Sequence, residues 1–223
     1  MTEILAGIEM TTSEIIQELS SGFSLTLLIF SITLVCSIPL GLIFSVIQRS
    51  KIKPIKWLMD VIVWVVRGTP LMLQIFAIYY GPNLVGLDGL NFNELTAVSV
   101  AFSLNYACYF SVIFKGGMDS IAKGQYEACQ LLGMTKVQSF KHVILPQVYK
   151  RVLPASSNEI ITLVKDTSLA NVIGVSELVF KGKILLNKGL LLPFFSTGLF
   201  YLIFVGLLTI IFKYLEKRSN RWQ

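Results

Sequence analysis

Charged side chains are scarce in this sequence. Only 14% of the 223 residues are Asp, Glu, Lys or Arg, whereas soluble domains carry about 25%. The mean hydropathy of +0.69 also argues against a water-soluble fold. The 3 cysteines are too few for a disulfide scaffold, and the polar fraction is too small for a disordered chain. Apolar residues are abundant instead, at 54%, so we expect an all-α membrane protein.

Five apolar stretches are long enough to cross a bilayer. A hydrocarbon core about 30 Å thick requires about 20 mostly apolar helical residues, because each adds about 1.5 Å. The second stretch is interrupted at 67–70, and the fourth is unusually polar near its middle. We predict five transmembrane helices at residues 23–47, 57–80, 95–114, 152–175 and 193–212. They form a membrane domain over 23–217, preceded by an external segment, 1–22, and followed by a cytoplasmic tail, 218–223.

The charges outside these stretches alternate in sign. Residues 1–22 carry glutamates without Lys or Arg, whereas residues 48–56 and 115–151 and the chain end are basic. Because Lys and Arg collect in cytoplasmic loops, we expect the N-terminus outside the cell and the C-terminus inside it. This topology explains the net charge of +6 without a nucleic-acid partner. Segment 176–192 is an exception, since it should be external yet is basic, and its leucine and lysine pattern predicts an interfacial amphipathic helix.

The longest polar segment, 116–150, lies between the third and fourth predicted spans. Ala128, Leu131 and Leu132 follow helical spacing and give one apolar face. Gly133 follows directly, and glycine readily adopts the left-handed conformation that ends helices. The pattern therefore predicts a short cytoplasmic helix that stops at this glycine.

A second short helix is predicted immediately afterwards. Thr135 and Gln138 have the spacing of a capping box, and we expect Pro146 to end the helix. The apolar positions of this helix are Val137, Phe140 and Ile144. Two such helices are too short to form a domain, so they either pack against the protein's own helix ends or dock onto another subunit.

Several motifs along the chain carry a resemblance to a known family. Segment 127–146 contains Glu-Ala-Cys, a glycine after three intervening residues, and Leu-Pro beginning twelve residues after that glycine. The full set is Arg67-Gly68-Thr69-Pro70-Leu71, Lys115-Gly116-Gly117, Gly124-Gln125-Tyr126-Glu127-Ala128, Leu145-Pro146-Gln147 and Lys165-Asp166-Thr167-Ser168-Leu169. With these motifs, residues 22–217 resemble the permease subunits of polar amino acid ABC importers, which include histidine, glutamine, arginine and cystine uptake systems. Cys129 replaces the family's usual second alanine.

The resemblance implies a division of labour among subunits in a bacterial cell membrane. The chain would pair with a second permease subunit, identical or different, and would work with an ABC ATPase dimer and an extracellular or periplasmic amino acid binding protein. ATP and Mg²⁺ would bind the ATPase, because this chain has no G-x-x-x-x-G-K-[ST] run. We therefore expect no enzymatic activity and no cofactor in this chain. The residues implied in ATPase coupling are Glu127, Ala128, Gly133, Met134 and Phe140.

Polar residues inside the predicted spans are candidates for the substrate path. A charge at the centre of a span costs about 2.5–3.5 kcal/mol on insertion scales, so such groups face the bundle or a water-filled cavity. Asn158 and Glu159 are the stronger candidates, while Lys165 and Asp166 fit a structural role equally well. The break at 67–70 either exposes polar backbone or only kinks the helix. The candidate residues are Arg67, Thr69, Gln74, Tyr109, Asn158, Glu159, Asp166, Thr167 and Ser168.

One departure from the family pattern bears on assembly. Val112 occupies a position where relatives commonly carry an acidic residue, which fits either a homodimer with a less charge-dependent substrate or one half of a heterodimer.

An alternative function is an ion-coupled carrier that titrates Glu159 and Asp166. No catalytic or metal-binding constellation stands out, and the single histidine, His142, fits a solvated surface residue. An intramembrane enzyme is therefore disfavoured.

Overall fold

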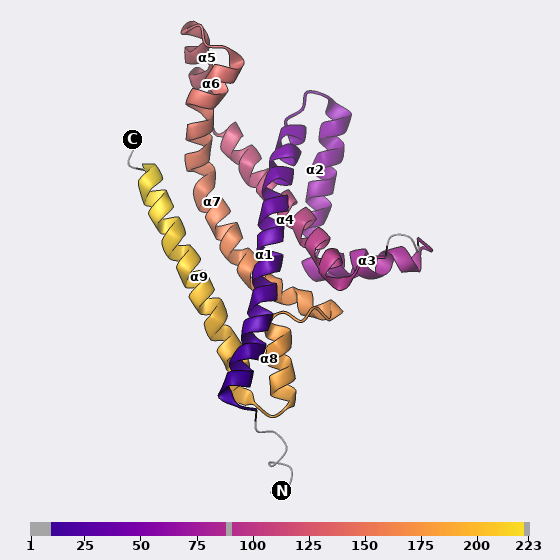
Figure 1. Cartoon of the computed structure of the whole chain (residues 1–223). Helices are drawn as coiled ribbons and strands as arrows, with labels where there is room; N and C mark the ends of the chain where they lie inside the picture. The colour runs from indigo at the N-terminus through magenta and orange to yellow at the C-terminus, as the bar shows by residue number, and fades with distance from the viewer. Residues whose placement is uncertain (1–9, 88–90, 221–223) are drawn as a thin grey trace, which may run out of the picture. The chain divides into compact units, whose positions relative to one another are not determined.

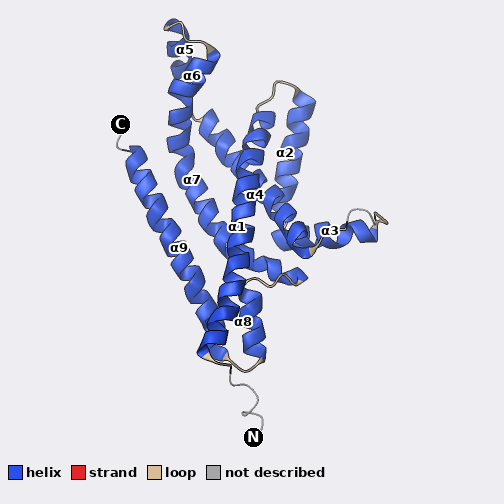
Figure 2. Ribbon diagram, viewed as in Figure 1, coloured by secondary structure: helices blue, strands red, loops and turns tan. Residues whose placement is uncertain are grey.

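The computed structural model describes residues 10–87 and 91–220, and every regular element in these ranges is a helix (Figure 2). This confirms the all-helical class. The α-helices, labelled in Figure 1, are α1 (Thr12–Gln48), α2 (Lys53–Gly68), α3 (Leu71–Leu84), α4 (Glu94–Asp119), α5 (Lys123–Leu131), α6 (Lys136–Ser139), α7 (Leu145–Asp166), α8 (Leu178–Asn187) and α9 (Leu191–Asn220). Two further helical segments are the π-helical turn η2 (Phe140–Ile144) and the 3-10 segment η3 (Thr167–Ile173).

Three of the described helices are long and apolar enough to cross a membrane, namely α1, α4 and α9. Helices α2 and α3 form a fourth candidate if they are counted as one span, bent by 106° at the break between them. The sequence break at 67–70 is thus a sharp bend, because Pro70 has no N–H with which to continue the backbone hydrogen bonds of α2. Helix α7 does not qualify, since Lys150, Arg151 and Glu159 put too many charges into every stretch of it that is long enough to span. The expected count of five spans stays a prediction.

Two helices extend beyond the expected span limits. Helix α1 begins at Thr12, well before residue 23, and the backbone N–H of Thr11 donates to Glu14 Oε2 at 2.7 Å. The N–H of Glu14 donates to Thr11 Oγ1 at 3.3 Å, so a capping box starts this helix inside the segment expected to lie outside the membrane. Helix α4 continues to Asp119, so the start of the expected 116–150 loop is helical.

The expectation that Pro146 ends the second short helix is wrong. Helix α6 continues through the π-helical turn η2 into α7, and Pro146 is the second residue of α7. The proline is accommodated because the π-helical turn before it has changed the hydrogen-bond spacing, with the Leu145 N–H donating to the Phe140 carbonyl. The wider η2 turn lets the chain change from one helix to the next without an intervening loop.

The chain divides into two compact units, whose boundary falls within α1, α4, α7 and α9. Unit 1 comprises residues 1–33, 71–101 and 162–207, and unit 2 comprises residues 34–70, 102–161 and 208–223. In unit 1, α8 packs against the start of α1 so closely that a Cβ on Gly22 would lie 2.9 Å from Leu178 Cα. In unit 2, a Cβ on Gly41 would lie 2.7 Å from Phe110 Cβ. These glycines permit close helix packing, as is usual in membrane proteins.

Candidate functional site

The segment from α5 to η2, residues 123–144, forms a helical hairpin in unit 2, which we call the coupling hairpin. Its turn is made by Gly133, which has φ +68°. The Gly133 N–H donates to the Gln130 carbonyl at 3.0 Å, and the Met134 N–H donates to the Cys129 carbonyl at 3.0 Å. The predicted left-handed helix end is thereby confirmed, because most other residues are strained at this backbone angle.

The second arm of the hairpin starts with the predicted capping box. The Gln138 N–H donates to Thr135 Oγ1 at 3.3 Å, and the Thr135 N–H donates to Gln138 Oε1 at 2.9 Å. Both backbone donors at the helix start are thus satisfied locally. The two short arms therefore have defined ends although neither is long enough to be stable alone.

The apolar face of the hairpin is exposed in this chain. Leu131, Leu132 and Val137 are 89%, 78% and 75% exposed, and Phe140 is also exposed. The buried positions of the hairpin are Cys129, Ser139 and Ile144. Three large apolar side chains on one small element form an uncovered patch of the kind that marks a protein interface. This favours docking onto another subunit over packing against the protein's own helix ends.

The expected coupling residues lie around this patch. Glu127 and Ala128 are exposed on α5, whereas Met134 is half-buried. Met134 and Phe140 line a groove of about 320 Å³ in the hairpin itself. The remaining lining residues of this groove are Tyr126, Gln130, Lys136 and Ser139. The hairpin therefore presents both protruding leucines and a shallow depression.

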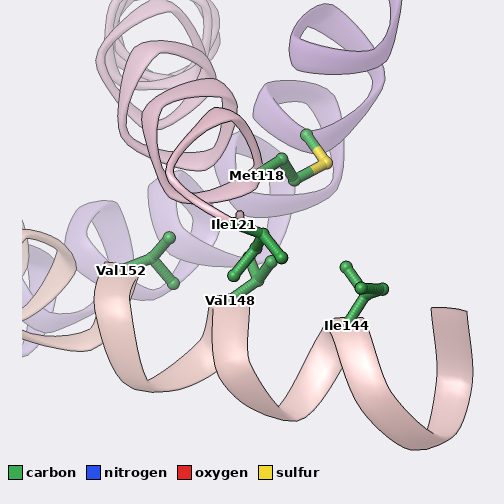
Figure 3. Close-up of a cluster of buried hydrophobic side chains, with 5 residues drawn as sticks. All are labelled: Met118, Ile121, Ile144, Val148 and Val152. Carbon is green, nitrogen blue, oxygen red and sulfur yellow. The ribbon is translucent and has the colours of Figure 1, made fainter. Parts of the chain in front are cut away.

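A buried apolar cluster connects the hairpin to the long helices of unit 2. Figure 3 shows Val148 and Val152 on α7 directed toward Ile121, with Met118 and Ile144 beside them. These side chains come from the end of α4, the α4–α5 turn, η2 and α7. We call this set, Met118, Ile121, Ile144, Val148 and Val152, the hairpin-base cluster.

Polar contacts reinforce the same region. Arg49, just after α1, has Nε 3.0 Å from Asp119 Oδ1, and Lys115 Nζ lies 3.2 Å from Asp119 Oδ2. Arg151 on α7 donates to the backbone carbonyl of Ser120. The ion pairs are partly exposed, so each stabilises by only about 0.2–1 kcal/mol. Their main effect is to fix the ends of α1, α4 and α7 relative to the hairpin.

Five of the candidate path residues lie in unit 2. The structure brings Arg67 and Tyr109 together, with the guanidinium carbon 4.9 Å from the ring centroid, a cation–π arrangement. The Thr69 hydroxyl donates to the Val65 carbonyl at 3.0 Å and so occupies a backbone acceptor at the end of α2. Asn158 is exposed and Glu159 is half-buried, both on α7.

The other four candidates lie in unit 1, where α3 and η3 pack against each other. Gln74 is a half-buried residue of α3. Asp166 ends α7, Thr167 Oγ1 donates to the Val164 carbonyl at 2.7 Å, and Ser168 Oγ donates to the Lys165 carbonyl at 2.8 Å. These two hydrogen bonds stabilise the backbone where the α-helix passes into the tighter 3-10 segment.

Glu177 is a buried carboxylate that lies in the segment 176–192 and is not among the predicted site residues. Its side chain is 0% exposed, and it caps α8 by accepting the N–H groups of Val179 and Phe180, each at 2.8 Å. Tyr201 donates its hydroxyl to Glu177 Oε2 at 3.1 Å. Burial raises the pKa of the Glu177 carboxyl, although these hydrogen bonds and Lys183 act in the opposite direction. An acidic residue immediately before an apolar helical run was the available signal.

An all-helical chain with apolar spans and an exposed hairpin of short helices has the features of a membrane transport subunit that works with a partner. Residues 37–221 match the family described as binding-protein-dependent transport system inner membrane component. The chain belongs to this family.

Individual relatives have more specific descriptions. The arginine transport system permease protein ArtQ of Bacillus subtilis (strain 168) is 36% identical over 201 residues, covering 88% of this chain and 90% of the relative. The L-cystine transport system permease protein TcyB of the same organism is 34% identical over 207 residues, covering 92% and 87%. A solved amino acid ABC transporter with histidines superposes with a TM-score of 0.83 at 28% identity, covering 95% of this chain and 100% of that chain.

Proposed function

We propose that this chain is the transmembrane permease subunit of an ATP-driven, binding-protein-dependent amino acid importer. The family and the functions named for its relatives support the class of transporter and the class of substrate. In this proposal, five spans form the path, with α7 and η3 supplying the fourth. The N-terminus lies outside the cell and the C-terminus in the cytoplasm, as the charge distribution predicts.

The exposed apolar face of the coupling hairpin carries the proposal. Leu131, Leu132 and Val137 point away from their own chain, while the hairpin-base cluster holds the hairpin on α4 and α7. An ATPase subunit that covers this face would bury the patch. Its movement on binding ATP and Mg²⁺ would then be transmitted to the helices, which alternate between inward-open and outward-open states.

The path would use the polar residues of both units. In unit 2, Arg67 is held against Tyr109, and in unit 1 the polar run Asp166–Ser168 sits where α7 changes into η3. These groups could bind the carboxylate and amino group of an amino acid in turn. A second permease subunit, of the same or a different kind, would complete the path, and a binding protein would deliver the substrate.

The energy source tests the function directly. The complete importer, reconstituted in vesicles with its ATPase and binding protein, should accumulate a radiolabelled amino acid only when ATP is present on the ATPase side. Dissipating the proton and sodium gradients should leave this uptake intact. Accumulation driven by an ion gradient without ATP would contradict the proposal and support an ion-coupled carrier.

The docking surface can be tested separately. Replacing Leu131 and Leu132 together by Ser should abolish co-purification with the ATPase, because it removes the two most exposed apolar side chains of the patch. The double change Leu191→Ser and Leu192→Ser is a matched control, since this exposed leucine pair lies at the start of α9. Equal recovery of the ATPase with both double variants would count against docking through the hairpin.

A further inference from the structure

A groove in unit 2 lies between the beginning of α7 and the end of α9, and it belongs to neither the hairpin nor the path. It encloses a cavity of about 710 Å³. Its lining residues are Leu145, Pro146, Tyr149, Lys150, Leu215, Arg218 and Ser219. The α7 members share one helical face, and the α9 members share another, because each set recurs at three- to four-residue spacing. We call this the α7–α9 groove.

The lining combines apolar surface with positive charge. Lys150 comes from α7 and Arg218 from α9, and both charged residues among the described lining residues are cations. The hydroxyl of Ser219 has no hydrogen-bond partner among the described residues. Leu145, Tyr149 and Leu215 supply most of the remaining wall. An occupant therefore needs an anionic, hydrogen-bonding end and an apolar body.

The position of the groove along α9 fits the headgroup layer of a membrane. The expected fifth span ends at residue 212, so Leu215 and Arg218 lie about 4.5 and 9 Å further along the helix axis. The headgroup region on each side of a bilayer is about 5–8 Å deep. The apolar part of the groove would thus lie near the edge of the hydrocarbon core, with the two cations level with lipid phosphates.

The outer surface of α9 is exposed along the helix up to this groove. Only 6% of the most apolar stretch of α9 is buried, and Ile210, Ile211 and Tyr214 are exposed just before the groove. Acyl chains that cover α9 would continue directly into the apolar wall. Basic pockets between transmembrane helices on the cytoplasmic side are a recognised setting for anionic lipid headgroups.

We propose that the α7–α9 groove is a binding site for an acidic phospholipid of the cytoplasmic leaflet. Lys150 and Arg218 bind the phosphate from opposite sides, and the acyl chains lie against Leu145, Leu215 and the exposed flank of α9. This proposal relies on the membrane placement of α9 in the proposed function but not on the identity of the transported solute. Because α7 also bears the hairpin-base cluster, a bound lipid would connect membrane composition to the coupling region.

The test compares lipid binding by two charge-matched double variants of the complete importer. Native mass spectrometry, with dioleoyl phosphatidylglycerol titrated into detergent solution, should show a lipid adduct that dioleoyl phosphatidylcholine does not form. Lys150→Gln with Arg218→Gln should weaken the adduct about 25-fold, since each cation near an anionic surface contributes about fivefold in affinity. Lys213→Gln with Lys217→Gln removes equal charge outside the groove lining and should bind like the wild type.

Other results would overturn the assignment. Equal weakening by both double variants would show diffuse surface attraction, and displacement of the lipid by millimolar inorganic phosphate would show a free-anion site. Cross-linking of Leu215→Cys to the second permease subunit would show that protein covers the groove. The single change Arg218→Gln should weaken binding about fivefold, and it keeps the test valid if the double variant misfolds. ATP-driven uptake by the same purified complexes reconstituted in vesicles separates failure of this site from failure of the proposed function.

Discussion

Glu177 places a carboxyl group at a buried junction of unit 1. It caps α8 and accepts the hydroxyl of Tyr201 on α9, while the neighbouring Leu178 N–H donates to Thr26 Oγ1 on α1 at 3.3 Å. One short stretch of backbone is thus tied to two long helices. Replacing one acceptor oxygen at such a site leaves a buried donor unpaired, which costs about 1–3 kcal/mol.

Glu177→Gln should therefore lower stability and also change its pH dependence. Burial raises the pKa of this carboxyl, so the folded protein binds the proton more tightly than the unfolded chain does. The resulting stabilisation is complete below the ordinary carboxyl pKa and declines as pH rises through the raised value. As pH rises from the ordinary carboxyl pKa through the raised one, the wild type should lose thermal stability relative to the Gln variant. The measurement is tryptophan fluorescence on heating at pH values between about 4 and about 8. A constant difference at every pH would refute the linkage.

The partners of Glu177 explain why sequence alone did not identify it. Tyr201 lies 24 residues further along the chain, and no local pattern indicates that its hydroxyl meets this carboxyl. Arg67 and Tyr109 illustrate the same limit, because both were named as polar candidates of the predicted spans while their 4.9 Å contact required the fold. A local signal within a few residues can be read from the sequence, whereas the contact of residues on different helices cannot.

At the scale of helices, the glycine and capping-box signals were reliable, whereas the proline stop signal was not. Gly133 and the Thr135–Gln138 box depend on contacts within a few residues, and the structure confirms both. The expectation for Pro146 was wrong, because a π-helical turn before it allowed α7 to begin there. The two units also depend on packing between residues far apart in the chain, which periodicity does not report.

The paired glycines at the end of α4 allow a sharp test of helix packing. A Cβ added to Gly117 would overlap Val152 Cγ1 of the hairpin-base cluster, whereas a Cβ on Gly116 meets nothing within 4 Å. Gly117→Ala should thus destabilise the protein by about 1–3 kcal/mol through overpacking. Gly116→Ala should be neutral or slightly stabilising, since alanine is the better helix former. Both effects are measurable as shifts of the unfolding midpoint.

A compensating change distinguishes overpacking from a backbone effect. Val152→Ala removes the methyl groups that the new Cβ would meet, so its combination with Gly117→Ala should cost less than the sum of the two single changes. Strict additivity in this cycle would show that Gly117 and Val152 are not packed together. For the control, the effects of Gly116→Ala and Val152→Ala on the free energy of unfolding should simply add.

At the scale of the whole molecule, the proposed function requires that movement of a partner ATPase, received at the hairpin, alters the substrate path. Helix α7 runs without interruption from Leu145, next to the hairpin, to Glu159, a separation of about 21 Å at 1.5 Å per residue. A continuous helix transmits displacement and rotation better than a loop of equal length. Ser156 and Ser157 lie within this stretch, shortly after Pro154, which already removes one backbone donor.

Replacing Ser156 and Ser157 by Gly should therefore uncouple the two ends of the helix. Each glycine destabilises a helix interior by about 0.5–1 kcal/mol relative to alanine, so the segment before Glu159 would bend more easily. The ATPase should still co-purify, because the hairpin is unchanged, but fewer amino acid molecules should enter vesicles per ATP hydrolysed. The same change at Ser20 and Ser21, an exposed serine pair of α1, is the control and should leave this ratio unaltered. An unchanged ratio in the α7 variant would mean that α7 is not the element that carries the movement.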